Sequence, residues 1–266
     1  MIARTFDLDA MPGSLLTTGN PKVAKGEAHG VLTAIMHLAP EKVSGRNVCP
    51  HATAGCAAAC LNTAGRGGIG LDANGLNTIQ VARIRRTRWF HRDRNGFLSA
   101  LVAETARHER TAIRHGLRPA VRYNGTSDIP WERWSVVRNG VTYPNIFAAF
   151  PNVTFYDYTK WPIRLRPLVA DIPNYSLTFS LADGEKSERE AAAALESGVN
   201  VAAVFAVKRG GDLPAWHAVG GRVAQVIDGD ATDLRFTDPR GERGVIVGLR
   251  AKGRAIQDRT GFVRQP

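Results

Sequence analysis

Three cysteines give this chain of 266 residues its clearest capacity for metal or redox chemistry. Cys49, Cys56 and Cys60 are its only cysteines, and they follow the spacing C-x6-C-x3-C. An odd number of thiols leaves one without a bridging partner, which argues against a secreted disulfide framework. Thiolates are also the ligands that iron–sulfur clusters and zinc favour. We therefore expect a metal or redox site in this segment.

The cysteine segment has three interpretations. Three thiolates can hold three irons of a [4Fe–4S] cluster and leave the fourth iron open, while the glycine and alanines between them would let the backbone approach closely. Alternatively, His51 joins the cysteines in a tetrahedral zinc site. In the third interpretation, the thiols bind nothing. Because the spacing differs from the commonest zinc motifs, the cluster is the favoured prediction.

Polar side chains follow an apolar run in the segment RYNGTSDIPWE. Alternation along a strand puts Arg122 and Asn124 on the same side, where a charged group is costly unless it is paired or bound to a ligand. Ser127 and Asp128 come next, in a turn that also suits an ordinary helix cap near Trp131. The functional interpretation gives cofactor binding to Arg122, Asn124 and Ser127, and a catalytic role to Asp128.

The segment FYDYTK repeats this arrangement after the next apolar run. Asp157 and Lys160 are predicted catalytic groups that bind or titrate against a polar substrate. In a purely structural alternative, Asp157 forms an ion pair with Arg122. Ser180, a predicted cofactor-binding residue, follows one further run. Catalytic groups gather at the carboxyl ends of parallel strands, so we expect these side chains on one face of the sheet.

A basic segment, ARIRRTRWFHRDR, interleaves arginines with aromatic residues. It could contact phosphates and stack bases, or it could be a solvated helix whose apolar side chains face the core. The preceding TAGRGGIG is rich in glycine but lacks the lysine of a phosphate-binding loop. Close approach to the metal site is the favoured role for those glycines. The arginines of the basic segment are Arg83, Arg85, Arg86, Arg88, Arg92 and Arg94.

Regularly spaced elements must position these groups. Short apolar runs predict strands, and amphipathic segments between them predict helices. This alternation predicts an α/β fold with a partial or closed (β/α) barrel of about seven mainly parallel strands, and an open doubly wound sheet is the second choice. The strands begin near Val31, Pro119, Asn152, Tyr175, Val199, Arg222 and Gly244, and the helices cover 77–92, 94–115 and 186–198.

Length and composition bound the remaining predictions. One barrel of about 250 residues would use most of the chain. We therefore expect a single domain over 1–266, with 1–30 as an N-terminal cap and 228–266 as a peripheral extension. A net charge of +11 and a pI near 10.1 favour a nucleotide or nucleic-acid partner. Neither a leader peptide nor a membrane span is recognisable, so we expect a cytoplasmic protein without a membrane partner.

The chain resembles a phage gene-product family with a three-cysteine loop. The resemblance rests on N20-P-K and K25-G, on the cysteine segment with the following GRG, and on RYNGTSDIPWE, FYDYTK and NYSLTFS, and it covers about residues 15–210. More distantly, the chain is similar to radical S-adenosylmethionine enzymes. These use a partial barrel and a three-cysteine [4Fe–4S] loop after the first strand, usually spaced C-x3-C-x2-C.

The second resemblance implies S-adenosylmethionine as a cofactor and an electron donor as a partner. The glycine-glycine-glutamate segment that usually binds the cofactor is absent, and NGTSD occupies its place, so Ser127 or Asp128 would make that contact. Our leading prediction is a radical enzyme acting on a nucleotide or nucleic acid. The alternatives are a nucleic-acid-binding protein with a structural cluster or zinc, and a base-exchange barrel with Asp128 or Asp157 as nucleophile.

Overall fold

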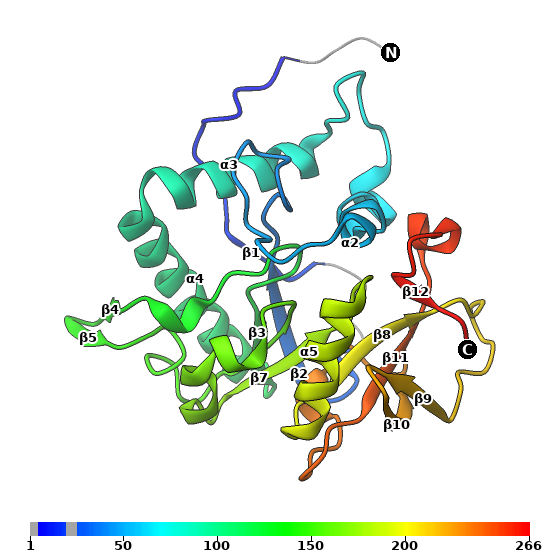
Figure 1. Cartoon of the computed structure of the whole chain (residues 1–266). Coiled ribbons are helices and arrows are strands. Elements are labelled where there is room, and N and C mark those ends of the chain that lie inside the picture. The colour runs from blue at the N-terminus through cyan, green and yellow to red at the C-terminus, as the bar shows by residue number, and fades with distance from the viewer. Residues whose placement is uncertain (1–4, 20–25) are drawn as a thin grey trace. The chain divides into compact units, whose positions relative to one another are not determined.

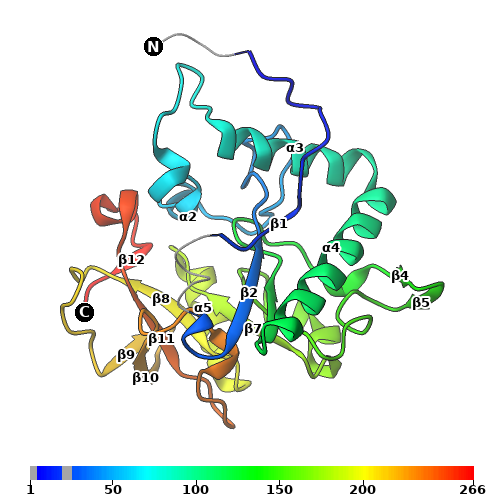
Figure 2. The same ribbon diagram turned by 180° about the vertical axis from the view of Figure 1, so that it is seen from behind.

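The computed structural model describes residues 5–19 and 26–266, and Figures 1 and 2 show the course of the chain from opposite sides. Asn20, Pro21, Lys22 and Lys25, which carry part of the family resemblance, lie outside the described residues. The helices are α2 (Ala54–Ala58), α3 (Thr78–Arg92), α4 (Arg94–Arg114) and α5 (Glu185–Glu196). The strands are β1 (Leu16–Thr17), β2 (Val31–Met36), β3 (Arg118–Arg122), β4 (Val136–Arg138), β5 (Val141–Tyr143), β6 (Thr154–Thr159), β7 (Tyr175–Ser180), β8 (Val201–Phe205), β9 (Trp216–Val219), β10 (Arg222–Asp228), β11 (Ile246–Arg250) and β12 (Val263–Arg264).

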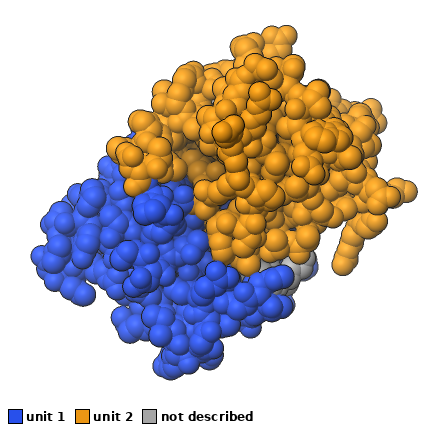
Figure 3. All heavy atoms as spheres, turned by 90° about the horizontal axis from the view of Figure 1, so that it is seen from below, with its two compact units in different colours: residues 1–50, 62–155, 172–175 blue, residues 51–61, 156–171, 176–266 orange. Residues whose placement is uncertain are grey.

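The chain divides into two compact units, coloured separately in Figure 3. Unit 1 comprises 1–50, 62–155 and 172–175, and unit 2 comprises 51–61, 156–171 and 176–266. The boundary at residue 50 falls inside the cysteine segment. Cys49 therefore belongs to unit 1, whereas Cys56 and Cys60 belong to unit 2.

Unit 1 contains a short sheet and two long helices, of which α4 packs against the sheet and α3 packs against α4. β1 is antiparallel to β2, β2 is parallel to β3, and β3 is parallel to the first two residues of β6. α3 and α4 connect β2 to β3, and α4 packs against both strands (Figures 1 and 2). Asn77 and Asp93 cap the two helices by accepting bonds from Gln80 N and Gly96 N, each 2.9 Å long. These caps fix where each helix begins.

Aromatic side chains form much of the unit 1 core. Phe97 stacks on Trp131 with ring centroids 6.3 Å apart, and Phe147 stacks on Tyr175 at 4.1 Å. All four rings are almost entirely buried. Burial of such large rings stabilises a fold by roughly 1.5–3 kcal/mol each, and it rigidly supports the polar loop that follows β3.

Unit 2 is built around a β7–α5–β8 crossover. β7 is parallel to β8, and β8 is parallel to β11, which is parallel in turn to β10. β9 is antiparallel to β10, and β12 runs parallel to the end of β8. Residues 228–266 thus contribute β11 and β12 to the sheet. The core of this unit consists of Phe179, Leu181, Ala191, Ala194, Leu195, Val201, Ala203, Phe205, Val219 and Ile246.

The local predictions agree with these elements. Each predicted strand and helix is present, and Gly198 follows α5 with a φ of +78°, a left-handed conformation that glycine adopts without strain. Most strand pairs are parallel, and the order of paired strands has two ends, β1 and β9. The described chain is therefore a mixed α/β protein with a mostly parallel sheet that does not close.

Candidate functional site

The cysteine loop, defined as residues 51–60 of unit 2, carries two thiols one helical turn apart. Thr53 begins α2 by accepting a bond from Cys56 N at 3.2 Å. Beyond α2 the turn continues, because Cys60 N donates to Ala57 O at 3.4 Å. Positions four residues apart lie on the same side of such a turn. The thiols of Cys56 and Cys60, both half-buried, can therefore serve one ligand.

Asp183 anchors the cysteine loop to the segment that follows β7. One carboxylate oxygen accepts a bond from the Thr53 hydroxyl, and the other accepts from Gly55 N at 3.3 Å. A Cβ atom at Gly55 would overlap both Asp183 and the Thr260 hydroxyl, so only glycine fits this approach. The loop position is thus fixed by contacts with residues far along the chain.

Two further contacts surround the cysteine loop. The His51 ring packs edge-on against Trp161, with centroids 4.4 Å apart. Thr260 is itself held by Asp258, whose carboxylate accepts a bond from the Thr260 hydroxyl at 2.7 Å and another from Val263 N at 3.0 Å. The cysteine loop of unit 2 therefore meets the residues after β6, after β7 and before β12.

Lys160 and Ser180, both predicted from the sequence, lie together in unit 2. The Lys160 ammonium donates to the Ser180 hydroxyl at 2.7 Å and to the Ser180 carbonyl at 3.3 Å. It also lies 5.6 Å from the ring centroid of Phe262, within the range of a cation–π interaction. Asp157 is 1% exposed within β6. A half-buried ammonium held in this way can bind a carboxylate or phosphate oxygen.

The predicted residues after β3 are brought together in unit 1. Asn124 Oδ1 accepts from Ser127 Oγ at 2.8 Å, from Ile129 N at 3.0 Å and from Trp131 Nε1 at 3.1 Å. The short 3₁₀ turn at Trp131 follows Pro130, whose side chain makes no capping bond. Asn124 and Ser127 thus organise their own loop.

Cys49 lies beside this same loop. Its thiol is within 3.8 Å of Thr126 O, and its backbone N–H donates to Asn47 Oδ1 at 2.7 Å. Asp128, which is 7% exposed, donates its backbone N–H to Val48 O at 2.8 Å. Unit 1 thus gathers Cys49, Asn124, Ser127 and Asp128, while Arg122 is a half-buried residue at the end of β3.

The side chains that could bind the predicted metal are the three cysteine thiols. Within the described residues, no group of three histidine, cysteine, aspartate or glutamate side chains is arranged to hold an ion. Cys56 and Cys60 lie one turn apart in unit 2, and Cys49 belongs to unit 1. The donor chemistry fits iron–sulfur or zinc ligation, and three-thiol ligation requires Cys49 to join the other two.

The arginines of α3 divide into two groups. Arg83 and Arg86 are buried; Arg83 donates to Asn62 O and Oδ1 at 2.5 and 2.6 Å, and Arg86 donates to Ser14 O at 2.6 Å. Burial lowers the pKa of Arg86, and the charge of Glu104 partly offsets this effect. Arg88 and Arg92, by contrast, remain partly exposed. The two buried arginines support the loop structure of unit 1.

The glycine-rich segment has a structural use. Gly67 O accepts from Asn77 Nδ2 at 3.3 Å and from Gln80 Nε2 at 2.8 Å. A Cβ on Gly67 would crowd Asn62 O, and one on Gly68 would overlap Thr63 O. These close approaches are between backbone segments of unit 1, and the predicted approach to a metal site stays a prediction.

The comparison with protein families bears on both units. The family described as Gene product 88 matches residues 14–266. The chain belongs to this family. The match includes the cysteine loop, the segment after β3 and the C-terminal strands. No curated protein and no solved structure matches the chain.

Sequence reasoning missed the anchoring residues. Thr53 had a local signal, because a threonine three positions before Cys56 suits a helix cap. The only signal at Asp183 is that a polar residue follows a strand, and Thr260 had no signal. No helix of the described residues has the length and apolar character needed to cross a membrane.

Proposed function

We propose that the chain is an iron–sulfur protein that acts as a radical S-adenosylmethionine-type enzyme on a nucleotide or nucleic acid. The observation that carries this proposal is the anchoring of α2 by Asp183, which orients two thiols of the cysteine loop. Such rigid support is what metal ligands require, because misplacement of ligands weakens binding. Cys49, Cys56 and Cys60 would be the three thiolate ligands.

The bound group would contribute its own chemistry, and the chain would contribute positioning. A [4Fe–4S] cluster with one open iron supplies an electron and a site for the cofactor's amino and carboxylate groups. In this proposal, Lys160 binds a carboxylate or phosphate oxygen, and Ser180 holds its ammonium in place. Asp128 and Asp157 remain candidates for contacts with substrate or cofactor.

The mostly parallel sheet supports a related architectural proposal. Radical S-adenosylmethionine enzymes use partial (β/α) barrels, and an open sheet with polar groups after its strands suits such a partial form. An electron donor would be a necessary partner. The basic charge of +11 favours a phosphate-bearing substrate.

The direct test is the metal and sulfide content of protein purified without oxygen, followed by titration with S-adenosylmethionine. We expect about four irons and four sulfides per chain and a visible spectrum that the cofactor perturbs. Ala57→Ser, an exposed change on α2, is the matched control for Cys56→Ala and should retain the spectrum. Stoichiometric zinc without iron would contradict the proposal and would favour a base-exchange enzyme or a structural site that includes His51.

A further inference from the structure

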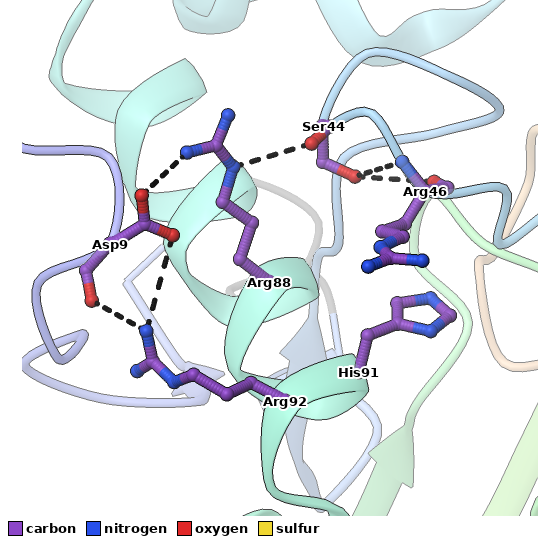
Figure 4. Close-up of a pocket in the computed structure, with 6 residues that line it drawn as sticks. All are labelled: Asp9, Ser44, Arg46, Arg88, His91 and Arg92. Carbon is purple, nitrogen blue, oxygen red and sulfur yellow. Dashed lines mark hydrogen bonds and ion pairs between the residues drawn. The ribbon is translucent and has the colours of Figure 1, made fainter.

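A basic pocket of about 420 Å³ opens on unit 1. Figure 4 shows Arg88 and Arg92 reaching toward Asp9, while the Arg46 guanidinium lies beside the His91 ring. The hollow is open, and its basic side chains come from a helix and a separate loop. The basic pocket consists of Asp9, Ser44, Arg46, Arg88, His91 and Arg92.

The end of α3 gathers three of these side chains. Arg88, His91 and Arg92 are spaced i, i+3 and i+4, which places them on one side of the helix. They occupy its last turns, where the partial negative charge of the helix C-terminus stabilises cations. The loop before Val48 brings Arg46 from the opposite side, and Ser44 fixes that loop through bonds of 3.2 Å with Arg46 N and O.

The charges of the basic pocket do not balance. Arg88 Nη1 lies 2.8 Å from Asp9 Oδ2, and Arg92 Nη1 lies 4.0 Å from Asp9 Oδ1. Arg46 pairs with no carboxylate among residues 5–19 and 26–266. Three guanidinium groups therefore face a single carboxylate, which leaves an excess of two positive charges. An anion entering here would meet donors already converging from two elements.

Asp9 is a replaceable counter-ion rather than a permanent partner. Its side chain is 61% exposed, and exposed ion pairs contribute little to stability. Arg92 is further held by donating to Asp9 O at 3.2 Å, and Arg88 by donating to Ser44 O at 3.3 Å. Both guanidinium groups are thus oriented by backbone carbonyls, so they would remain in place when another anion takes the position of the carboxylate.

The pKa of His91 is affected by the positive charges around the basic pocket. Partial burial, and then the charges of Arg94 and Arg46, lower the pKa of His91 below its ordinary value. A bound anion would oppose the effect of these charges and favour the protonated ring. The imidazole would then become an additional N–H donor to the ligand.

We propose that the basic pocket binds a phosphate group. Guanidinium groups recognise phosphate oxygens through paired N–H donors, and Arg46, Arg88 and Arg92 can surround one such group. The proposed function already names a nucleotide or nucleic-acid substrate, and the inference rests on it only for that ligand class. An open, solvent-facing site with excess positive charge suits a phosphate that belongs to a strand or to a free nucleotide.

The test uses the full-length protein and two probes at low salt. One is a fluorescently labelled single-stranded oligonucleotide followed by anisotropy, and the other is ATP added as competitor. We expect the double variant Arg46→Gln, Arg92→Gln to bind the oligonucleotide, or both the oligonucleotide and ATP, about tenfold more weakly than the unchanged protein does. The slope of log affinity against log salt should also fall. If the double variant loses affinity only for the oligonucleotide, the ligand is the phosphate of a strand. If it also loses affinity for ATP, the pocket is a nucleotide site.

Arg114→Gln is the matched control. Arg114 is the exposed last residue of α4, as Arg92 is of α3, so this change removes one positive charge from an equivalent helix position and matches the Arg92→Gln component of the double variant. It should leave affinity within about twofold of the unchanged protein, as expected for a distant screened charge. Equal affinities for the double variant and the control, with both probes, would overturn the inference.

The metal content of each arginine variant separates this inference from the proposed function. If the cluster is absent but the double variant still weakens binding, the phosphate site stands and the enzyme proposal fails. If the cluster is present and the arginine changes have no effect, the phosphate site fails alone. Circular dichroism spectra that match the unchanged protein would verify that the exposed substitutions preserve the fold.

Discussion

The cysteine loop of unit 2 and the basic pocket of unit 1 are built in different ways. Asp183 holds the cysteine loop by accepting hydrogen bonds from the Thr53 hydroxyl and from Gly55 N, and the packing around Gly55 leaves no room for a Cβ atom. The basic pocket has exposed guanidinium groups around a carboxylate that is 61% exposed. Metal ligation depends on ligand distances within tenths of an ångström, whereas attraction of phosphate depends mainly on the density of charge.

This difference predicts how each region responds to change. Replacement of a proposed cysteine ligand should act in an all-or-none manner, because in the proposal a cluster that loses a ligand is not retained. A substitution in the basic pocket should produce a graded change in affinity and salt dependence.

Replacing Cys56 by alanine should remove nearly all bound iron and the visible spectrum, because in the proposal one of three protein ligands is lost. Iron analysis of anaerobically purified protein measures the effect. Oligonucleotide affinity of the same variant should change by less than about twofold, since the basic pocket keeps its charges. A Cys56→Ala protein that keeps its iron would contradict the ligand assignment.

Replacing Cys49 by alanine tests whether the cysteine of unit 1 is a metal ligand together with the two cysteines of unit 2. If three-thiol ligation is correct, this change in unit 1 should abolish cluster binding as completely as Cys56→Ala does. Its iron content and spectrum should be measured beside those of Ala57→Ser. Full iron occupancy in Cys49→Ala would restrict the metal site to unit 2 and remove the radical enzyme from consideration.

Replacing Gly55 by alanine should destabilise the chain by about 1–3 kcal/mol, the usual cost of overpacking. The added Cβ would overlap Asp183 and Thr260, so the cysteine loop must shift. Urea unfolding followed by circular dichroism measures the stability, and iron content should fall with it. Ala57→Ser is again the control, and unaltered stability would show that the loop tolerates the shift.

Replacing Asp9 by asparagine should strengthen oligonucleotide binding, because it removes the competing carboxylate from Arg88 and Arg92. At the distances of an exposed pair, the gain is about 1 kcal/mol or less. Anisotropy titrations at two salt concentrations measure it, and the gain should shrink at high salt. A loss of affinity would mean that Asp9 organises the arginines rather than competing for them.

The pH dependence of phosphate binding should be the smallest effect. The pKa of free His91 is lowered, so the ring is neutral above that lowered value, and an anion favours its protonated form. Binding then takes up a proton, and affinity should rise as pH falls toward the free-state pKa. The groups that set this field are Arg46, Arg94, Arg88, Arg92 and Asp9.

His91→Gln provides the control for this dependence. The glutamine variant should retain binding at neutral pH while losing the increase in affinity at lower pH, because its side chain does not titrate. Anisotropy titrations at several pH values and constant ionic strength make the comparison. An unchanged pH dependence in the variant would assign the effect to the ligand or to another group.

The amino-acid sequence by itself determined the elements and part of the candidate site. Strands such as β2 and helices such as α3 were predictable because periodic apolar residues and caps act over a few positions. For Lys160 and Ser180, the sequence predicted only that both side chains lie on one face of the sheet, because residues that follow parallel strands converge there. It did not predict the hydrogen bond between them. The cysteine spacing likewise indicated ligand chemistry without indicating which contacts hold the loop.

Tertiary structure alone decided the partners. Thr53 meets Asp183 across 130 positions, and Arg88 meets Asp9 across 79. It also decided that Arg83 and Arg86 turn inward while Arg88 and Arg92 remain accessible, which charge spacing along a helix does not specify. The physical reason is that local preferences fix backbone conformation, whereas ion pairs and steric limits between distant segments arise only when the chain packs.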